Sequence, residues 1–276
     1  MLLPRYVPSK FLLPYLVLVT CLAACQDKDA APEARQCAGT SASAAGRVVV
    51  RYQEQLGSGG PAAALICHDE VMHPCANYLL DQVVTSAGDQ LGIHFKGAIT
   101  PNICLTQPRL AYSQVDLSKL AIGTYAVAWQ AGSKQTTGTI NVLADRVEVS
   151  SCDSNTVAVR NPVTYRIPAT TIWGQSYART PAAQAAVAVV LDSLRKEGAV
   201  PITLPAGQYS YFQVDAAGKL VPISASQNGQ PASAITTPIL LSYSGNFARL
   251  RGVLKRKPQA ADLSMSLQSA RGENGW

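Results

Sequence analysis

The clearest structural signal in the sequence is residues 124–143, which read TYAVAWQAGSKQTTGTINVL. Two alternating runs lie within it, Thr124–Gln130 and Gln135–Leu143. Side chains of a β-strand point to opposite faces in turn, so such alternation indicates strands with one buried face. Between the runs, residues 131–134 (AGSK) have the small and polar side chains of a tight turn. The stretch therefore predicts a β-hairpin.

A short motif lies just ahead of this hairpin. Leu120, Gly123 and Tyr125 stand in the order Leu-x-x-Gly-x-Tyr. The motif resembles the tyrosine corner of immunoglobulin-like and fibronectin-like sandwiches, in which the tyrosine hydroxyl bonds back to the backbone. Residues 47–160 also carry about seven short strand patterns, the number that such a sandwich requires. The resemblance implies an immunoglobulin-like β-sandwich over 47–160.

The pattern changes after Tyr165, where helices join the strands. Thr180 can cap a helix that begins at Pro181, and Gly198 follows its end. A hairpin is expected around residues 215–218, and a second helix over about 246–256. Strands mixed with two helices predict a small α+β domain over 161–258. A last strand and a polar tail are expected over 259–276.

The N-terminus has the order of a secretory signal. Arg5 and Lys10 precede an apolar run, Phe11–Ala24, that ends in small residues. The run closes with Leu22-Ala23-Ala24-Cys25, which resembles the lipobox of bacterial lipoproteins. The resemblance implies cleavage before Cys25 and acylation of its thiol and its new amino group. Residues 1–24 would then be the signal peptide and Cys25 the site of lipid attachment.

This segment has two alternative interpretations. A transmembrane helix needs about 20 apolar residues, whereas Phe11–Ala24 has 14 and is interrupted by Pro14. A plain secretory signal, in which Cys25 is incidental, is the second alternative. The small residues and the cysteine coincide at the end of the apolar run, which favours the lipoprotein.

The residues after Cys25 indicate a tether and a location. Residues 26–29 (QDKD) resemble the acidic surface-export signal of lipoproteins in the Bacteroidota. That resemblance implies an outer-membrane lipoprotein facing the cell surface. Residues 30–46 are rich in Ala, Ser and Gly without a hydrophobic period, so 25–46 is expected to be a flexible tether.

Composition limits the class of partner. Removal of residues 1–24 leaves 252 residues and lowers the formal charge from +6 to +4, because Arg5 and Lys10 leave with the signal. Charged residues make up 14% of the chain and hydrophobic residues 47%, so a real core can form. So mild a positive charge does not support nucleic-acid binding. The expected partners are the membrane, through Cys25, and an unknown protein or glycan ligand.

The mature chain has five cysteines besides Cys25: Cys37, Cys67, Cys75, Cys104 and Cys152. An exported chain meets an oxidising compartment, where disulfides are the default. Because five is odd, at least one thiol is free or pairs outside the chain. Cys75 and Cys104 flank a predicted hairpin over 77–95 and are the candidate pair. Cys67–Cys75 is the competing pairing.

Residues 67–75 (CHDEVMHPC) form the densest cluster of potential metal ligands. His68, His73 and Cys75 are its weak candidates for zinc. Their spacing matches no zinc finger, ribbon or His-Glu-x-x-His helix. Pro74 and its neighbours instead predict a solvated loop. No metal and no cofactor is therefore expected.

Catalytic signals are sparse. No histidine follows His94, so a Ser–His dyad confined to the C-terminal half is impossible. Ser193 and Lys196 have the Ser-x-x-Lys spacing of penicillin-recognising enzymes but stand at the end of the predicted helix. The sequence thus predicts an envelope lipoprotein with a non-enzymatic binding or structural role. A metal-dependent or hydrolytic envelope enzyme that uses the 67–75 cluster is the alternative.

Overall fold

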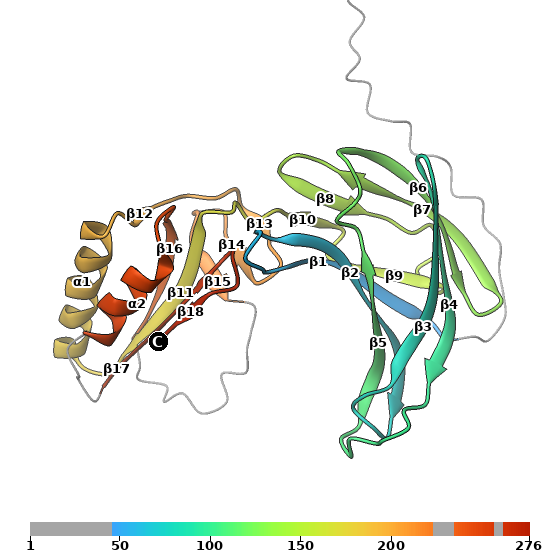
Figure 1. Ribbon diagram of the computed structural model, residues 1–276, viewed down its shortest axis with the longest axis horizontal. Coiled ribbons are helices and arrows are strands. Elements are labelled where there is room, and N and C mark those ends of the chain that lie inside the picture. The colour runs from blue at the N-terminus through green and yellow to red at the C-terminus, as the bar shows by residue number, and fades with distance from the viewer. Residues whose placement is uncertain (1–45, 223–234, 257–261) are drawn as a thin grey trace, which may run out of the picture. The chain divides into compact units, whose positions relative to one another are not determined.

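The computed structural model describes residues 46–222, 235–256 and 262–276. Within them the chain is mostly β, with two helices near its C-terminal end (Figure 1). The predicted signal peptide, Cys25 and residues 26–45 of the predicted tether lie outside the described residues. In the part of the chain that is described, no helix is both long and apolar enough to span a membrane.

One mixed sheet contains ten strands, and its spatial order is β10-β8-β7-β6-β4-β3-β5-β2-β1-β9. The strands are β1 Val48–Gln55, β2 Ala62–His73, β3 Leu79–Ala87, β4 Gln90–Ile99, β5 Arg109–Asp116, β6 Gly123–Ala131, β7 Lys134–Val142, β8 Arg146–Val149, β9 Val157–Arg160 and β10 Val163–Tyr165.

The two edge strands of this sheet, β9 and β10, are adjacent in sequence. Only Asn161 and Pro162 connect them. Asn161 has a φ of 55°, in the left-handed region that asparagine adopts more readily than most residues. A connection of two residues can join opposite edges only if the sheet is strongly curled. The curl encloses a core cluster that includes Trp129, Phe95 and Leu65.

The prediction of an immunoglobulin-like sandwich was wrong. A sandwich has two antiparallel sheets that face each other, whereas residues 48–165 form one continuous hydrogen-bonded sheet. Three of its strand pairs are parallel: β1 with β9, β3 with β5 and β4 with β6. The alternating pattern is the same in both folds, because it marks which face of a strand is buried and not which strand lies next to it.

Local predictions in this region were confirmed. The hairpin of β6 and β7 pairs Thr124 with Asn141 and Ala131 with Lys134. The turn contains Gly132 at a φ of 59°, a conformation that costs glycine nothing. Ahead of it, the Tyr125 hydroxyl donates a hydrogen bond to the Ala121 carbonyl at 3.1 Å. The hydrogen bond typical of a tyrosine corner is therefore present in a fold that is not an immunoglobulin-like sandwich.

The C-terminal part contains a five-stranded sheet, a three-stranded sheet and two helices. The five-stranded sheet has the order β12-β16-β11-β17-β18. The bounds are β11 Thr171–Ala178, α1 Pro181–Lys196, β12 Val200–Pro201, β13 Gly207–Gln208, β14 Phe212–Val214, β15 Leu220–Pro222, β16 Ile235–Ser242, α2 Phe247–Lys255, β17 Leu263–Ser269 and β18 Asn274–Gly275.

Both predicted helices were confirmed, and so was the predicted Thr180 cap of the first. Thr180 Oγ1 accepts a hydrogen bond from Ala183 N at 3.2 Å at the start of α1, and Asn246 Oδ1 accepts from Ala248 N at 2.9 Å at the start of α2. Gly198, at a φ of 96°, follows the end of α1.

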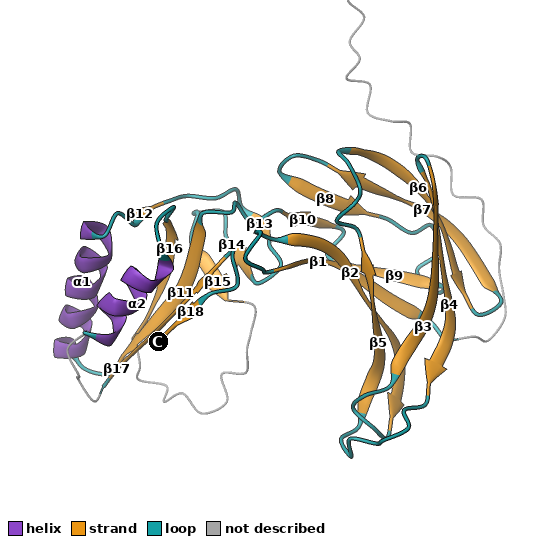
Figure 2. Cartoon of the chain, viewed as in Figure 1, coloured by secondary structure: helices purple, strands orange, loops and turns teal. Residues whose placement is uncertain are grey.

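The helices cover one face of the five-stranded sheet (Figure 2). On that face, Val187 and Leu194 of α1 and Leu250 of α2 belong to one buried cluster with β11, β16 and β17. The other face packs on the three-stranded sheet, where the Trp173 ring lies 5.3 Å from that of Phe212.

Candidate functional site

A pocket of about 690 Å³ lies beside the ten-stranded sheet. One wall is the sheet face that points away from the core, and it contributes Arg51 from β1, His68 from β2 and Arg160 from β9. The opposite wall is the segment Gln208–Gln213 at the start of the three-stranded sheet. The pocket thus brings together residues that lie more than 150 positions apart in the sequence.

Strand register places the sheet side chains in two rows. Arg51 is the register partner of Arg160 on the parallel strand β9 and of Ile66 on the antiparallel strand β2. In the next row His68 is paired with Tyr112 of β5. Register partners point to the same face of a sheet, and neighbouring strands are about 4.8 Å apart. The two arginines therefore project side by side into the pocket.

The pocket is electropositive. Arg51, Arg109 and Arg160 line it, and no carboxylate does. Among the described residues none of these three arginines forms an ion pair. Like charges placed opposite each other on neighbouring strands destabilise a sheet. The pair of Arg51 and Arg160 thus carries a repulsion that no side chain in the pocket offsets.

The wall opposite the sheet is rigidly held. The Tyr209 side chain is buried, its ring stacks on Phe212 at 4.8 Å, and its hydroxyl donates to the Pro205 carbonyl at 3.0 Å. Burial raises the pKa of Tyr209 to about 12, so its hydroxyl stays protonated. The flanking Gln208 and Ser210 consequently keep fixed positions at the pocket.

Glu54, near the end of β1, links the wall at residues 208–213 to the ten-stranded sheet through hydrogen bonds. Its backbone N–H donates to Ser210 Oγ at 2.8 Å, and its carbonyl accepts from the Tyr211 hydroxyl at 2.7 Å. Its carboxylate accepts from Ile167 N at 2.7 Å and lies 3.8 Å from Arg166 Nε. Burial raises the pKa of this carboxyl to about 7, although the hydrogen bond and the arginine oppose the shift.

The predicted ligand cluster at 67–75 is dispersed by the fold. Residues 67–73 belong to β2 and not to a solvated loop, so successive side chains point to opposite faces. Cys67 is a free thiol in the core, where burial raises its pKa to about 12. His68 lines the pocket, with Nδ1 2.7 Å from the Asp69 carbonyl oxygen.

His73 and Cys75 have other partners. His73 Nε2 lies 2.6 Å from Asp69 Oδ2, and its ring stacks on Tyr78 at 4.4 Å. Cys75 is bonded to Cys104, which confirms the candidate pairing over its competitor, Cys67–Cys75. In the described ranges no group of three or more His, Cys, Asp or Glu side chains could hold a metal ion.

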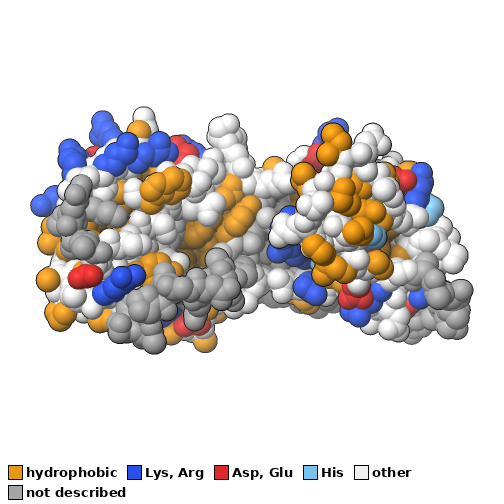
Figure 3. Space-filling model, turned by 90° about the horizontal axis from the view of Figure 1, so that it is seen from below, with side chains coloured by type: hydrophobic (Ala, Val, Ile, Leu, Met, Phe, Trp, Pro, Cys, Tyr) orange, Lys and Arg blue, Asp and Glu red, His pale blue; other side chains and the backbone are white. Residues whose placement is uncertain are grey.

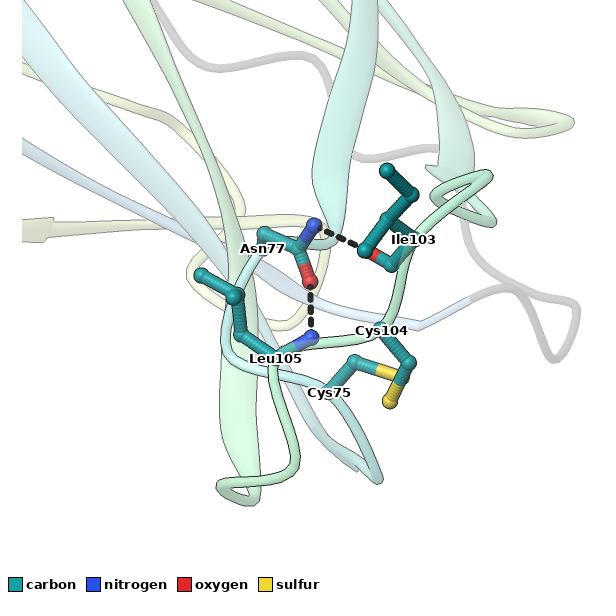
Figure 4. The surroundings of a disulfide bond; sticks show 5 residues. All are labelled: Cys75, Asn77, Ile103, Cys104 and Leu105. Atoms are coloured by element: carbon teal, nitrogen blue, oxygen red, sulfur yellow. Dashed lines mark hydrogen bonds between the residues drawn. A yellow bond between two sulfur atoms is a disulfide. The ribbon is translucent and has the colours of Figure 1, made fainter.

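Figure 4 shows the residues around the Cys75–Cys104 disulfide. The Asn77 amide donates to the Ile103 carbonyl at 2.6 Å and accepts from Leu105 N at 3.1 Å. These bonds fix the segment that carries Cys104 against the end of β2. The bridge and the amide together form a structural clamp at the end of the sheet.

No protein-family model, no curated protein and no solved structure matches this chain.

Sequence reasoning did not find the central residues of this pocket. Arg51 and Arg160 are 109 positions apart and belong to no motif. The only local signal is an arginine on the outward face of an alternating strand, which is a common feature of exposed strands. Their pairing follows from β9 returning parallel to β1.

Proposed function

We propose that this chain is a lipid-anchored envelope protein with a non-enzymatic binding role, and that its ligand binds in the pocket beside Arg51. Cys25, at the end of a short apolar run after two positive charges, would carry the lipid. Two or more acyl chains hold a protein stably at a membrane, whereas one does so only marginally. Residues 25–46 would hold the folded part away from the bilayer.

The pocket is the observation that carries the binding role. It is concave and of ligand size, and a few hydrogen-bonding side chains converge in it, as in small-molecule sites of other proteins. The wall at residues 208–213 is held by two hydrogen bonds of Glu54: its N–H donates to Ser210 Oγ, and its carbonyl accepts from the Tyr211 hydroxyl. A preformed wall lowers the entropy lost on binding.

The enzymatic alternative has less support from the geometry. It relied on the 67–75 cluster, of which Cys75 is in a disulfide and Cys67 lies in the core. An oxidised sulfur cannot ligate a metal as a thiolate. His68 and His73 remain, but they are on β2 with different partners.

The anchor is tested by labelling cells that express the chain with a radioactive fatty acid. The wild type should incorporate the label and fractionate with membranes. Cys25→Ser should lose the label and either be released or remain unprocessed. An unlabelled wild type would contradict the anchor.

The binding site is tested by filling the pocket of the full-length chain. Gln213 is exposed on β14 and lines the pocket, so Gln213→Trp should occupy it. Gln90→Trp, at an exposed strand position on β4, is the matched control. Titration with fluorescent oligosaccharides and peptides should give saturable binding that Gln213→Trp abolishes and Gln90→Trp preserves. Binding that is equally strong in both variants would place the site elsewhere.

A further inference from the structure

We infer that the pocket takes an acidic oligosaccharide and holds a carboxylate of it between Arg51 and Arg160. The inference rests on the proposed binding function and adds the chemical class of the ligand. It is carried by three features of the pocket: a pair of like charges, a lining without acids, and a set of neutral groups suited to sugar hydroxyls.

The like charges are the first feature. Arg51 and Arg160 are direct register partners on β1 and β9, and both line the pocket. Each guanidinium presents a planar set of donors that matches a carboxylate, often through two parallel hydrogen bonds. An anion between them would replace a repulsion with two charge-assisted contacts. The site is thus arranged for a negative group before any ligand arrives.

Three arginines outside the pocket show the contrast with this pair. Arg146 lies 2.8 Å from Glu148, Arg195 lies 2.7 Å from Asp192, and Arg47 lies 3.8 Å from Glu70. Each of these has a carboxylate of its own. The arginines of the pocket have none among the described residues, so their charge remains available to a ligand.

A second group of cations does not offer a comparable site. Figure 3 shows Lys and Arg side chains gathered at the end of the chain that carries the two helices. On α2 the Arg251 side chain donates to the Asn274 carbonyl at 3.1 Å and lies over the Phe247 ring, and Lys255 stands in the last turn of the helix. Cations in a last turn complement the helix dipole. Positive charge alone therefore does not single out the pocket, whereas its lining does.

The neutral lining indicates a sugar as the carrier of the anion. Asn161, Gln208 and Gln213 bring amide groups to the pocket, and amides both donate to and accept from hydroxyls. Gln213 Nε2 donates to Gln208 Oε1, and Gln208 Nε2 donates to the Tyr209 carbonyl, so the Asn161 amide and the Gln213 side-chain oxygen are the groups that face a ligand. Tyr112 is 48% exposed beside His68 and offers an aromatic face to the apolar side of a sugar ring. Nucleic acid is disfavoured because binding it usually needs a dense basic face, and the chain carries a mild charge.

The test is a titration of the full-length chain, in detergent, with carboxylated oligosaccharides. Oligogalacturonate, oligomannuronate and hyaluronan fragments are each compared with their neutral methyl esters. At least one acid should bind ten or more times more tightly than its ester, because the ester keeps the ring and loses the charge. Its affinity should fall as salt is raised.

Variants assign the effect to the arginine pair. Arg51→Gln and Arg160→Gln should each weaken binding of the acid at least tenfold and leave binding of the ester unchanged. Arg47→Gln, outside the pocket, is the matched control and should leave both unchanged. Neither pocket variant should lower the thermal midpoint, since each removes a like-charge repulsion. If either arginine had a structural role, its variant would show a lower thermal midpoint than the wild type.

The outcomes separate this inference from the proposed function. Equal affinity for acid and ester, with binding still abolished by Gln213→Trp, would overturn the acidic ligand and keep the binding pocket. Failure of every acid to bind, or equal losses in Arg47→Gln and Arg51→Gln, would also overturn it. Tighter binding of a single-stranded oligonucleotide of equal charge would replace the sugar with a nucleic acid.

Discussion

Glu54 is the residue on which the connection between β1 and the C-terminal part depends. Its side chain is 1% exposed, and its amide, carbonyl and carboxylate each bond to a residue between 167 and 211. A buried carboxylate loses its hydration, which disfavours the charged form. The pKa of Glu54 is therefore raised from 4.5 to about 7.

A raised carboxyl pKa makes stability depend on pH in a defined direction. Between pH 4.5 and 7 the folded state binds the Glu54 proton more tightly than the unfolded state does. The stabilisation that this proton gives to the folded state is therefore complete below pH 4.5. It is lost as the pH rises through 7. Over this range we expect the free energy of unfolding of the wild type to fall by about 3 kcal/mol more than that of Glu54→Gln. Denaturant unfolding at each pH measures both.

Glu148→Gln is the control for this measurement. The hydrogen bond from Arg146 lowers the pKa of Glu148, so its contribution is lost as the pH falls and not as it rises. The variant should keep the wild-type slope between pH 4.5 and 7. Parallel curves for wild type and Glu54→Gln would show that Glu54 ionises normally.

Tyr125, in the tyrosine-corner motif, is expected to contribute little to stability through its hydroxyl and more through its ring. Its hydroxyl bonds to the exposed Ala121, and its ring is half-buried against the core cluster. Water can replace the lost partner, so Tyr125→Phe should cost less than about 1 kcal/mol of unfolding free energy. Tyr125→Ala should cost about 2 kcal/mol because part of the ring leaves the core.

Denaturant unfolding, with the exposed Tyr112→Phe as control, checks the Tyr125 prediction. A loss of more than 2 kcal/mol in Tyr125→Phe would mean that the Ala121 carbonyl is left unpaired away from water. The expected loss of unfolding free energy is smaller than that for a tyrosine corner buried inside a sandwich, because Ala121 is exposed here and Tyr125 is only half-buried.

At the scale of elements, the Cys75–Cys104 bridge ties the end of β2 to the segment before β5. It closes a loop with a sequence separation of 29 that contains the β3–β4 hairpin. A crosslink of this length limits the unfolded chain and contributes about 3–4 kcal/mol in the chain-entropy description. Cys75→Ser combined with Cys104→Ser should lower the free energy of unfolding by about that amount.

The hydrogen bonds of the Asn77 amide allow a second test of the role of this loop. Its amide bonds should keep the loop in place in the serine variant, so adding Asn77→Ala should loosen the loop further and raise amide hydrogen exchange in β3 and β4. A serine variant that unfolds at the wild-type denaturant concentration would show that the bridge adds no stability.

Elements set by neighbouring residues were predictable. The helix over 181–196 follows from Thr180, Pro181 and Gly198, which act within one turn of its ends. The β6–β7 hairpin follows from alternation and a tight turn. The short strand β9 has no such signal, because four residues cannot show a period and its partner is about 100 positions away.

For the whole molecule, the turn-forming residues 153–155 and 161–162 place the boundary between the two predicted domains within 153–166, and this boundary stays a prediction. β9 and β10 lie inside this window, and each belongs to an edge of the ten-stranded sheet. Their backbone bonds protect them from cleavage. We therefore expect limited proteolysis to cut in the turn at residues 168–170 and to leave a stable fragment with all ten strands. A first cut at Ser154 or Asn155 would place the boundary inside the predicted window.

The sequence alone predicted the β-rich first half, the two helices and an odd number of cysteines after Cys25, while the export signal before Cys25 stays a prediction. These depend on side-chain period, caps and counts, which act within a few residues. Only the tertiary structure decided that β4 pairs with β6, that β9 returns to β1, and that Arg51 therefore stands beside Arg160. The physical reason is that alternation fixes which face of a strand is buried. The partner of each strand is fixed by packing inside the curl, which no local pattern encodes.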